Sequence, residues 1–202
     1  HILSQDEKKV TAFHEAGHAL VAASLPNADP VHKVSIVSRG RAAGYTLKIP
    51  DHDRHLHTRS HFLDDLAVSL GGYAAEDLVF GELTTGASDD IKRASDLARA
   101  LVMKYGMSSK VGPVAFGHDQ GAIFLGKELT SERNYSEHVA EIIDEEVSGF
   151  MKNAFKKAKT ILSAKRHKLE EIANYLIEHE SIEKEQFDRI MAGGSKRAGV
   201  TA

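Results

Sequence analysis

Hydrophobic residues at the start of the chain recur with the period of an α-helix. Val10, Phe13 and Leu20 fall on one face, which predicts a helix over residues 5–25 with one buried side. Ser4 precedes this segment and can cap it, and Pro26 stops it. The segment is therefore expected to pack on the rest of the domain through that one face.

Hydrophobic and polar positions then alternate, which is the pattern of β-strands. Val34 and Ile36 alternate with polar neighbours. Tyr45 and Leu47 repeat the pattern after a glycine-containing connection. Two such segments in succession predict a two-stranded β-ribbon.

Helical spacing returns over residues 54–80. The Gly71–Gly72 pair in this stretch indicates either close packing or a kink. A further helix is predicted from Asp89 to about Tyr105, and Ser88 is placed to cap it.

The last third of the chain, residues 135–191, has the amphipathic pattern of two or three long helices. The predicted fold class is therefore mainly α, an array of about six helices with a small two-stranded β-ribbon. We expect a single domain over residues 1–192, followed by a flexible tail over residues 193–202.

Composition narrows the functions that this fold can carry. The 202 residues include 26 basic and 29 acidic ones, so charge gives no reason to expect a nucleic acid as partner. There is no cysteine, hence any metal must be held by nitrogen and oxygen ligands, and 12 histidines supply the nitrogen. No stretch reaches the roughly 20 apolar residues that span a bilayer, and the start lacks the apolar core of a signal peptide. We expect the chain to be a soluble piece of a larger protein.

The sequence His14-Glu15-Ala16-Gly17-His18 is an H-E-x-x-H motif inside the first predicted helix. Spacing of four places both histidines on one helical face, where both imidazoles can bind one zinc ion. Zinc lowers the pKa of a bound water from about 15.7 to near 7. Glu15 is then placed to take the proton from that water and pass it to the leaving amine. The motif predicts a zincin-like peptidase helix.

A catalytic zinc needs a third protein ligand and an open fourth position. Two groups of carboxylates downstream are candidates. Glu76 and Asp77 follow the glycine pair, whereas Asp89 and Asp90 stand at a helix start. Spacing alone leaves both groups open.

A second histidine cluster comprises His52, His55, His57 and His61. His57 and His61 have the spacing of a helical pair. No carboxylate pattern completes a metal site there, so we interpret the cluster as a solvated polar surface.

Four blocks in the chain resemble the FtsH family of AAA-type, ATP-dependent, membrane-anchored zinc metalloproteases. They are HEAGHAL (residues 14–20), KVSIVSRGRAAGYT (33–46), LGGYAAEDLVFGELTTGASDDIKRAS (70–95) and MSSKVGPVAF (107–116). The resemblance extends over nearly the whole chain, from about Leu3 to Met191.

The resemblance implies one Zn²⁺ per chain, held by the two motif histidines and by an aspartate that corresponds to Asp90. It gives Glu76 a supporting role near the metal, such as orienting a histidine. Asp89 stands where the family mostly has Asn, which leaves a question about which aspartate binds. Tyr73 stands where Arg is common.

The resemblance also implies a wider context. Members of the family carry an ATPase module and an N-terminal membrane anchor, and they form homo-hexamers that degrade unfolded or threaded polypeptides. No P-loop occurs in this chain, so ATP would act only through the missing module. A full-length protein would be a membrane protein with this domain on the cytoplasmic, matrix or stromal side, and the membrane would be contacted only through the missing anchor.

An exposed strand edge beside the zinc can hold an extended peptide through backbone hydrogen bonds. The candidate substrate strand is the run Lys33, Val34, Ser35, Ile36, Val37. The alternative to an enzyme is an inactive zinc-binding structural or oligomerisation module of the same fold. A helical di-metal protein would need repeated E-x-x-H pairs on facing helices, and only scattered matches occur.

Overall fold

The computed structural model of the chain describes residues 4–38, 43–51, 55–117 and 133–193. Within them the fold is mainly α, as predicted, with seven α-helices, one short 3₁₀ helix and three β-strands. The tail expected over residues 193–202 lies, apart from its first residue, outside the described part. In chain order the elements are α1 (Gln5–Ser24), β1 (Val31–Ser35), β2 (Tyr45–Lys48), α2 (Arg59–Ser69), α3 (Gly71–Phe80), η1 (Thr85–Ala87), α4 (Ser88–Met103), α5 (Glu137–Ala164), α6 (Arg166–His179), β3 (Ser181–Glu183) and α7 (Lys184–Met191).

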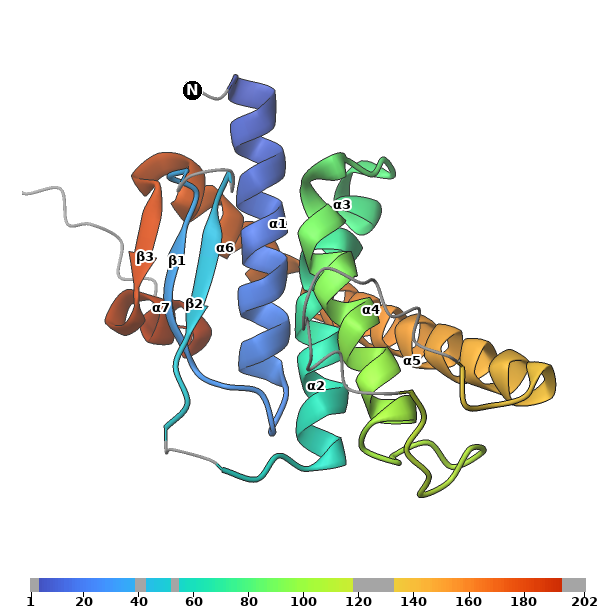
Figure 1. Cartoon of the computed structure of the whole chain (residues 1–202). Helices are drawn as coiled ribbons and strands as arrows, with labels where there is room; N and C mark the ends of the chain where they lie inside the picture. Colours follow the sequence, from blue (N-terminus) through green and yellow to red (C-terminus); the bar gives the residue numbers. More distant parts are fainter. Residues whose placement is uncertain (1–3, 39–42, 52–54, 118–132, 194–202) are drawn as a thin grey trace, which may run out of the picture.

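Helix α1 runs through the middle of the molecule (Figure 1). The sheet lies on one side of it, and α2, α3 and α4 lie on the other. Helix α5 extends from this group of helices as a long arm, and α6 and α7 return to the sheet. No helix in the described ranges combines the length and apolar composition needed to cross a bilayer.

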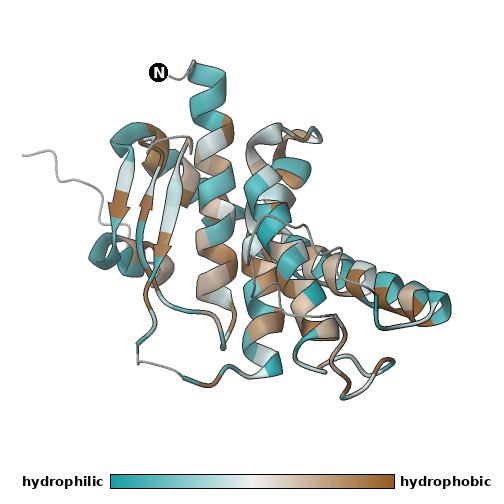
Figure 2. Ribbon diagram, viewed as in Figure 1, coloured by the Kyte–Doolittle hydropathy of each residue, from teal (hydrophilic) through white to brown (hydrophobic). Residues whose placement is uncertain are grey.

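The two halves of α1 have different surroundings. Its start is fixed by a capping box, in which the Glu7 amide donates to Ser4 Oγ at 3.2 Å and the Ser4 amide donates to Glu7 Oε2 at 2.9 Å. Figure 2 shows hydrophilic residues at this end and hydrophobic ones toward the other. Residues 12–22 are all buried, so this half is enclosed on every side rather than along one face.

Glycines bring α1 and α3 unusually close together. A Cβ added at Gly17 would collide with the Gly71 carbonyl oxygen and lie 2.7 Å from Ala75 Cβ. A Cβ at Gly71 would likewise lie 2.8 Å from the Gly17 carbonyl oxygen. The stretch predicted as one helix over residues 54–80 is in fact two helices that meet at Leu70. The glycine pair therefore serves both purposes considered from the sequence, a helix break and a close contact.

The predicted ribbon is part of a three-stranded antiparallel sheet with the order β2-β1-β3. Strand β3 was not predicted, because three residues between two helices carry no recognisable alternation. Lys33, Val34 and Ser35 each pair with a residue on both neighbouring strands. The expectation that Lys33–Val37 offers a free strand edge is therefore wrong, since β1 is the central strand.

Two further local predictions meet the structure differently. Helix α4 begins at Ser88 without a side-chain cap, because the turn of η1 leads directly into it. Tyr73, where Arg is common in the family, packs edge-on against Phe155 with ring centroids 5.3 Å apart. This aromatic contact joins α3 to α5.

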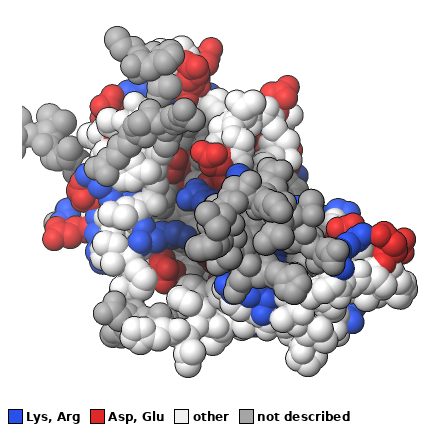
Figure 3. Space-filling view, in the orientation of Figure 1, with Lys and Arg blue, Asp and Glu red and all other residues white. Residues whose placement is uncertain are grey.

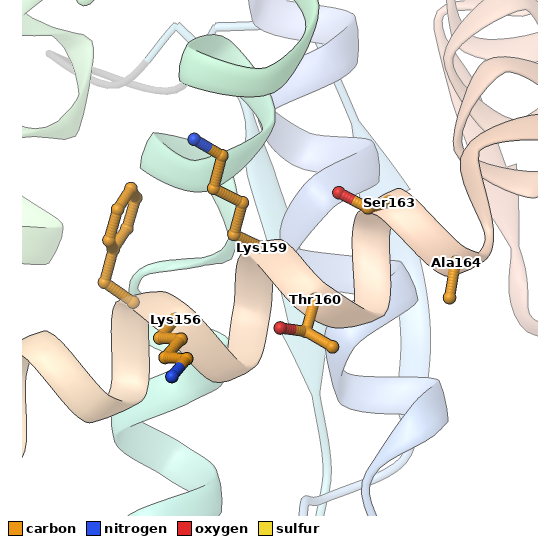
Figure 4. Close-up of a pocket in the computed structure, with 6 residues that line it drawn as sticks. Lys156, Lys159, Thr160, Ser163 and Ala164 are labelled. Atoms are coloured by element: carbon orange, nitrogen blue, oxygen red, sulfur yellow. The ribbon is translucent and has the colours of Figure 1, made fainter.

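A surface groove of about 630 Å³ follows the C-terminal half of α5 (Figure 4). All its lining residues belong to that helix, and one of them, Lys159, is held by Asp77 of α3 at 2.6 Å. The residues that line the groove are Phe155, Lys156, Lys159, Thr160, Ser163 and Ala164. None of the residues predicted to form the zinc site is among them.

The α1–α3 contact predicts a large cost for one methyl group. Gly17→Ala should lower the free energy of unfolding by at least about 2 kcal/mol, because backbone atoms on both helices must separate. Gly149→Ala in α5 is the matched control, since nothing lies within 4 Å of its added Cβ. That variant should be neutral or up to about 1 kcal/mol more stable. Urea denaturation at a fixed zinc concentration measures both, and equal stabilities would contradict the packing described.

Candidate metal centre

The two motif histidines and one distant aspartate converge on a single point. His14 and His18 stand one turn apart on α1, and their Nε2 atoms are 3.0 Å apart. Asp90, in the first turn of α4, places Oδ2 at 3.0 Å from His14 Nε2 and 3.1 Å from His18 Nε2. Among the described residues this is the one group of three or more His, Asp or Glu side chains arranged to hold a metal ion.

The other ring nitrogen of each histidine has its own partner. His14 Nδ1 lies 2.9 Å from Glu76 Oε2, and His18 Nδ1 lies 2.7 Å from the Val68 carbonyl oxygen. Both partners are acceptors, so each Nδ1 carries a hydrogen and donates it. When its ring is neutral, each histidine then presents the Nε2 lone pair to the centre, which is the orientation of metal-binding histidines.

These atoms fit Zn²⁺. Two imidazole nitrogens and a carboxylate oxygen, all electron-pair donors, face one another at 3.0–3.1 Å. Ligands bound tetrahedrally at 2.0–2.1 Å would be separated by about 3.3 Å, close to the spacing observed. Without a cation between them, such an arrangement of lone pairs would be repulsive. The donor set of nitrogen and oxygen is one that zinc accepts.

The electrostatics of the site also favour a positive charge. Burial alone would lower the pKa of His14, but its hydrogen bonds to Asp90 and Glu76 outweigh burial and raise that pKa to about 10. Burial would raise the pKa of Asp90, yet the hydrogen bonds from His14 and His18 bring it well below its usual range. The pKa of Glu76 is lowered in the same way, since its bonds to His14 and Thr84 overcome the effect of burial.

The raised pKa of His14 makes the stability of the metal-free fold depend on pH. The pKa of His14 is higher in the folded chain than its ordinary value of 6.5, so protonated His14 stabilises the fold. That contribution is complete below pH 6.5 and is lost as the pH rises toward 10. In the metal-free fold the positive charge is supplied by the proton on His14, and a metal must displace this proton to bind.

Glu15 lies beside the ligand atoms without joining them. It is 7% exposed, and its charge contributes to raising the pKa of His14. The Thr46 hydroxyl of β2 donates to Glu15 Oε2 at 2.8 Å. A Cβ at Gly44 would lie 2.9 Å from Glu15 Cγ, so a glycine leaves room for the glutamate at the start of β2. The carboxylate is therefore held in place between the helix and the sheet.

The structure separates the two carboxylate pairs that spacing left open. Asp90 faces both histidines, whereas Asp89 is exposed and lies outside the ligand cluster. Glu76 is fully buried against His14, whereas Asp77 forms an ion pair with Lys159. Thus one member of each pair belongs to the site.

The second histidine cluster is only partly as interpreted from the sequence. His52 lies outside the described residues, and His55 and His57 are exposed. His61 is buried, contrary to the expected solvated surface, because its Nδ1 bonds the Asn27 carbonyl oxygen at 2.8 Å and its ring stacks on His57.

Several residues of the site were missed by sequence reasoning. Val68 contributes only a backbone oxygen, which no side-chain pattern reveals. Gly72 lies against the His14 ring, where an added Cβ would come within 2.6 Å of Cδ2. Thr46 and Thr84 hold the two glutamates, and both fall in blocks shared with the resembling family, which is the signal that could have singled them out.

On the face seen in Figure 3, acidic and basic side chains are interspersed rather than gathered by sign. The concentrated negative charge is instead internal, where Glu15, Glu76 and Asp90 surround two imidazoles. A helix carrying H-E-x-x-H, completed by a distant carboxylate and with the motif glutamate beside the ligands, defines the zincin class of metallopeptidase sites.

The chain belongs to peptidase family M41, whose sequence model matches residues 1–190. The resemblance to FtsH proteins is confirmed by relatives named ATP-dependent zinc metalloprotease FtsH. FtsH 1 of Sphaerobacter thermophilus is 51% identical over 189 residues, 94% of this chain and 29% of that protein. The FtsH protein of Pseudothermotoga lettingae is 50% identical over 191 residues, which are 94% of this chain and 30% of that protein. The FtsH protein of Thermotoga maritima is 47% identical over 192 residues, which are 95% of this chain and 32% of that protein. The chain spans about three tenths of the length of these relatives.

The geometry predicts which aspartate governs zinc affinity. Asp90→Asn removes the anionic ligand and should weaken zinc binding by more than the 10- to 100-fold typical of an outer partner. Asp89→Asn is the matched control, and as an exposed change it should alter affinity by no more than about twofold. Competition against a zinc-binding dye measures both constants. The reverse order of effects would show that Asp89 is the ligand.

Proposed function

We propose that residues 1–192 form a zinc-dependent endopeptidase domain, with His14, His18 and Asp90 as metal ligands and Glu15 as the general base. The observation that carries the proposal is the meeting of two imidazole nitrogens and a carboxylate oxygen at 3.0–3.1 Å, beside a buried glutamate. Membership of peptidase family M41 supports the same chemistry.

Each residue of the proposed site has a separate role in catalysis. A bound Zn²⁺ supplies Lewis acidity, which makes a water nucleophilic at neutral pH and polarises the peptide carbonyl. Glu15 accepts the proton of the attacking water and returns it to the departing amine. The hydrogen bond from Thr46 keeps one oxygen of Glu15 fixed, so that the other can exchange the proton. Glu76 and the Val68 carbonyl hold the imidazoles in the orientation that metal binding requires.

The proposed substrates are unfolded or threaded polypeptides. The relatives are named ATP-dependent, and the chain matches about three tenths of their length, so the ATP-using part would lie elsewhere in a longer protein. We propose that this domain works in a homo-hexamer with an AAA ATPase module that threads substrate to it. The membrane would be reached through an N-terminal anchor, with this domain on the cytoplasmic, matrix or stromal side.

We propose β2 in place of β1 as the strand that holds the substrate, because β1 is the central strand of the described sheet. Strand β2 is at the end of the described sheet, and it carries the hydroxyl that bonds Glu15. A peptide paired with its outer edge would lie beside the catalytic carboxylate. Because a strand bonds its neighbour through the backbone, such binding suits substrates of many sequences.

The base is tested by Glu15→Gln, which keeps the shape of the side chain but cannot accept the proton. We expect about one zinc per chain in both proteins and a loss of at least about 100-fold in the rate of peptide hydrolysis, since general-base catalysis contributes 10²–10⁴-fold. Zinc content and cleavage of an unfolded protein are measured on the same samples. Zinc binding with no hydrolysis by either protein would instead favour the inactive structural module.

The substrate strand is tested with N-methylated peptide inhibitors. Every second backbone amide of a bound extended peptide would point toward β2 and donate a hydrogen bond to it. Methylating the nitrogens of these amides should weaken inhibition by about threefold to tenfold for each hydrogen bond lost. Methylating the other set, whose amides point away from β2, is the control and should have little effect. Equal effects of both sets, or no effect of either, would contradict binding along β2.

A further inference from the structure

One threonine, Thr84, holds one of the two carboxylate oxygens of the fully buried Glu76. Thr84, just before η1, donates twice to Glu76 Oε1, from its hydroxyl at 2.5 Å and from its backbone amide at 3.2 Å. Glu76 Oε2 receives the hydrogen of His14 Nδ1. Among the described residues, the hydrogen bonds to the Glu76 carboxylate come from Thr84 and His14.

The same hydroxyl also fixes the chain that leads to Asp90. Thr84 Oγ1 accepts the backbone amide of Gly86 at 3.2 Å and so caps η1. The three residues of η1 run directly into α4, whose first turn carries Asp90. One hydroxyl is thus bonded at once to the partner of His14 and to the turn before Asp90.

We propose that Thr84 is a positioning residue of the metal centre, whose hydroxyl sets His14 through Glu76 and Asp90 through η1. The proposal rests on the proposed function only in that the centre binds zinc. The hydrogen bonds that the described residues give the Thr84 side chain go to Glu76 and Gly86 rather than to the ligand atoms, so Thr84 acts through the two groups that it holds.

Charge and burial explain why this hydroxyl matters. Glu76 is 0% exposed, and its carboxylate is held by hydrogen bonds from His14 and Thr84. A buried carboxylate that loses a donor is poorly compensated, so it turns toward another donor. That movement releases the His14 ring from the orientation in which Nε2 faces the metal. Loosening of the η1 turn would at the same time release the start of α4.

The test is the zinc dissociation constant of the whole chain, measured by competition with a chromophoric chelator. Thr84→Val removes the hydroxyl and keeps the shape, and it should weaken zinc binding about tenfold, the range for an outer partner of a metal ligand. Thr84→Ser keeps the hydroxyl and should remain within about threefold of the wild type. Thr85→Val, a change in the adjacent exposed threonine, should stay within about twofold.

A double-mutant cycle separates positioning from general destabilisation. In a Glu76→Gln background, Thr84→Val should lose clearly less affinity than it does alone, because the path from Thr84 through Glu76 to His14 is already disrupted and only the path through η1 remains. Full additivity, an unchanged affinity in Thr84→Val, or an equal loss in Thr85→Val would overturn the proposal. If Thr84→Val does not fold, the serine variant decides, since a tenfold loss there would rule out the hydroxyl as the cause. A wild-type chain that binds no zinc would refute the proposed function instead.

Discussion

The metal centre depends on how closely α1 can approach α3. Gly17 and Gly71 let the two backbones touch, and Gly72 leaves room for the His14 ring. At this separation the side chain of Glu76, on α3, reaches His14 Nδ1 across the interface. An added Cβ at Gly17 or Gly71 would collide with the backbone of the other helix, and separating the helices would lengthen the hydrogen bond between Glu76 and His14. The orientation of His14, one of the proposed zinc ligands, therefore follows from backbone packing in the core.

Negative charge is then concentrated where solvent cannot screen it. Glu15, Glu76 and Asp90 lie around two imidazoles, and His14 responds with a pKa raised to about 10. Burying three carboxylates is costly unless each is paired. The hydrogen bonds from Thr46 and Thr84 partner the two glutamates, whereas Asp90 faces the imidazoles and is also bonded by Arg93 at 2.8 Å. The surroundings of His14 therefore favour a positive charge at this point.

The sequence allowed the helices and the motif to be predicted, because both depend on local spacing. Four-residue spacing was enough to place His14 and His18 on one face of α1. The choice of Asp90 over Asp89 came from family resemblance, since position within one helical turn cannot be read from composition. The central place of β1 was missed because its second neighbour, β3, comes about 150 residues later in the chain. Pairing between such distant segments is decided by tertiary packing, which a local pattern does not encode.

The arrangement of ligands also ties metal binding to the stability of the fold. Helix α1 packs chiefly on α3 and α6, whereas α4 packs chiefly on α2 and α5. Asp90 is the point at which α4 reaches the histidines of α1. A metal bound by these three side chains would link α4, which packs on α2 and α5, to α1, which packs on α3 and α6. Because the unfolded chain lacks this geometry, the free energy of metal binding adds to that of folding. The same ion that activates a water would therefore hold the active site together.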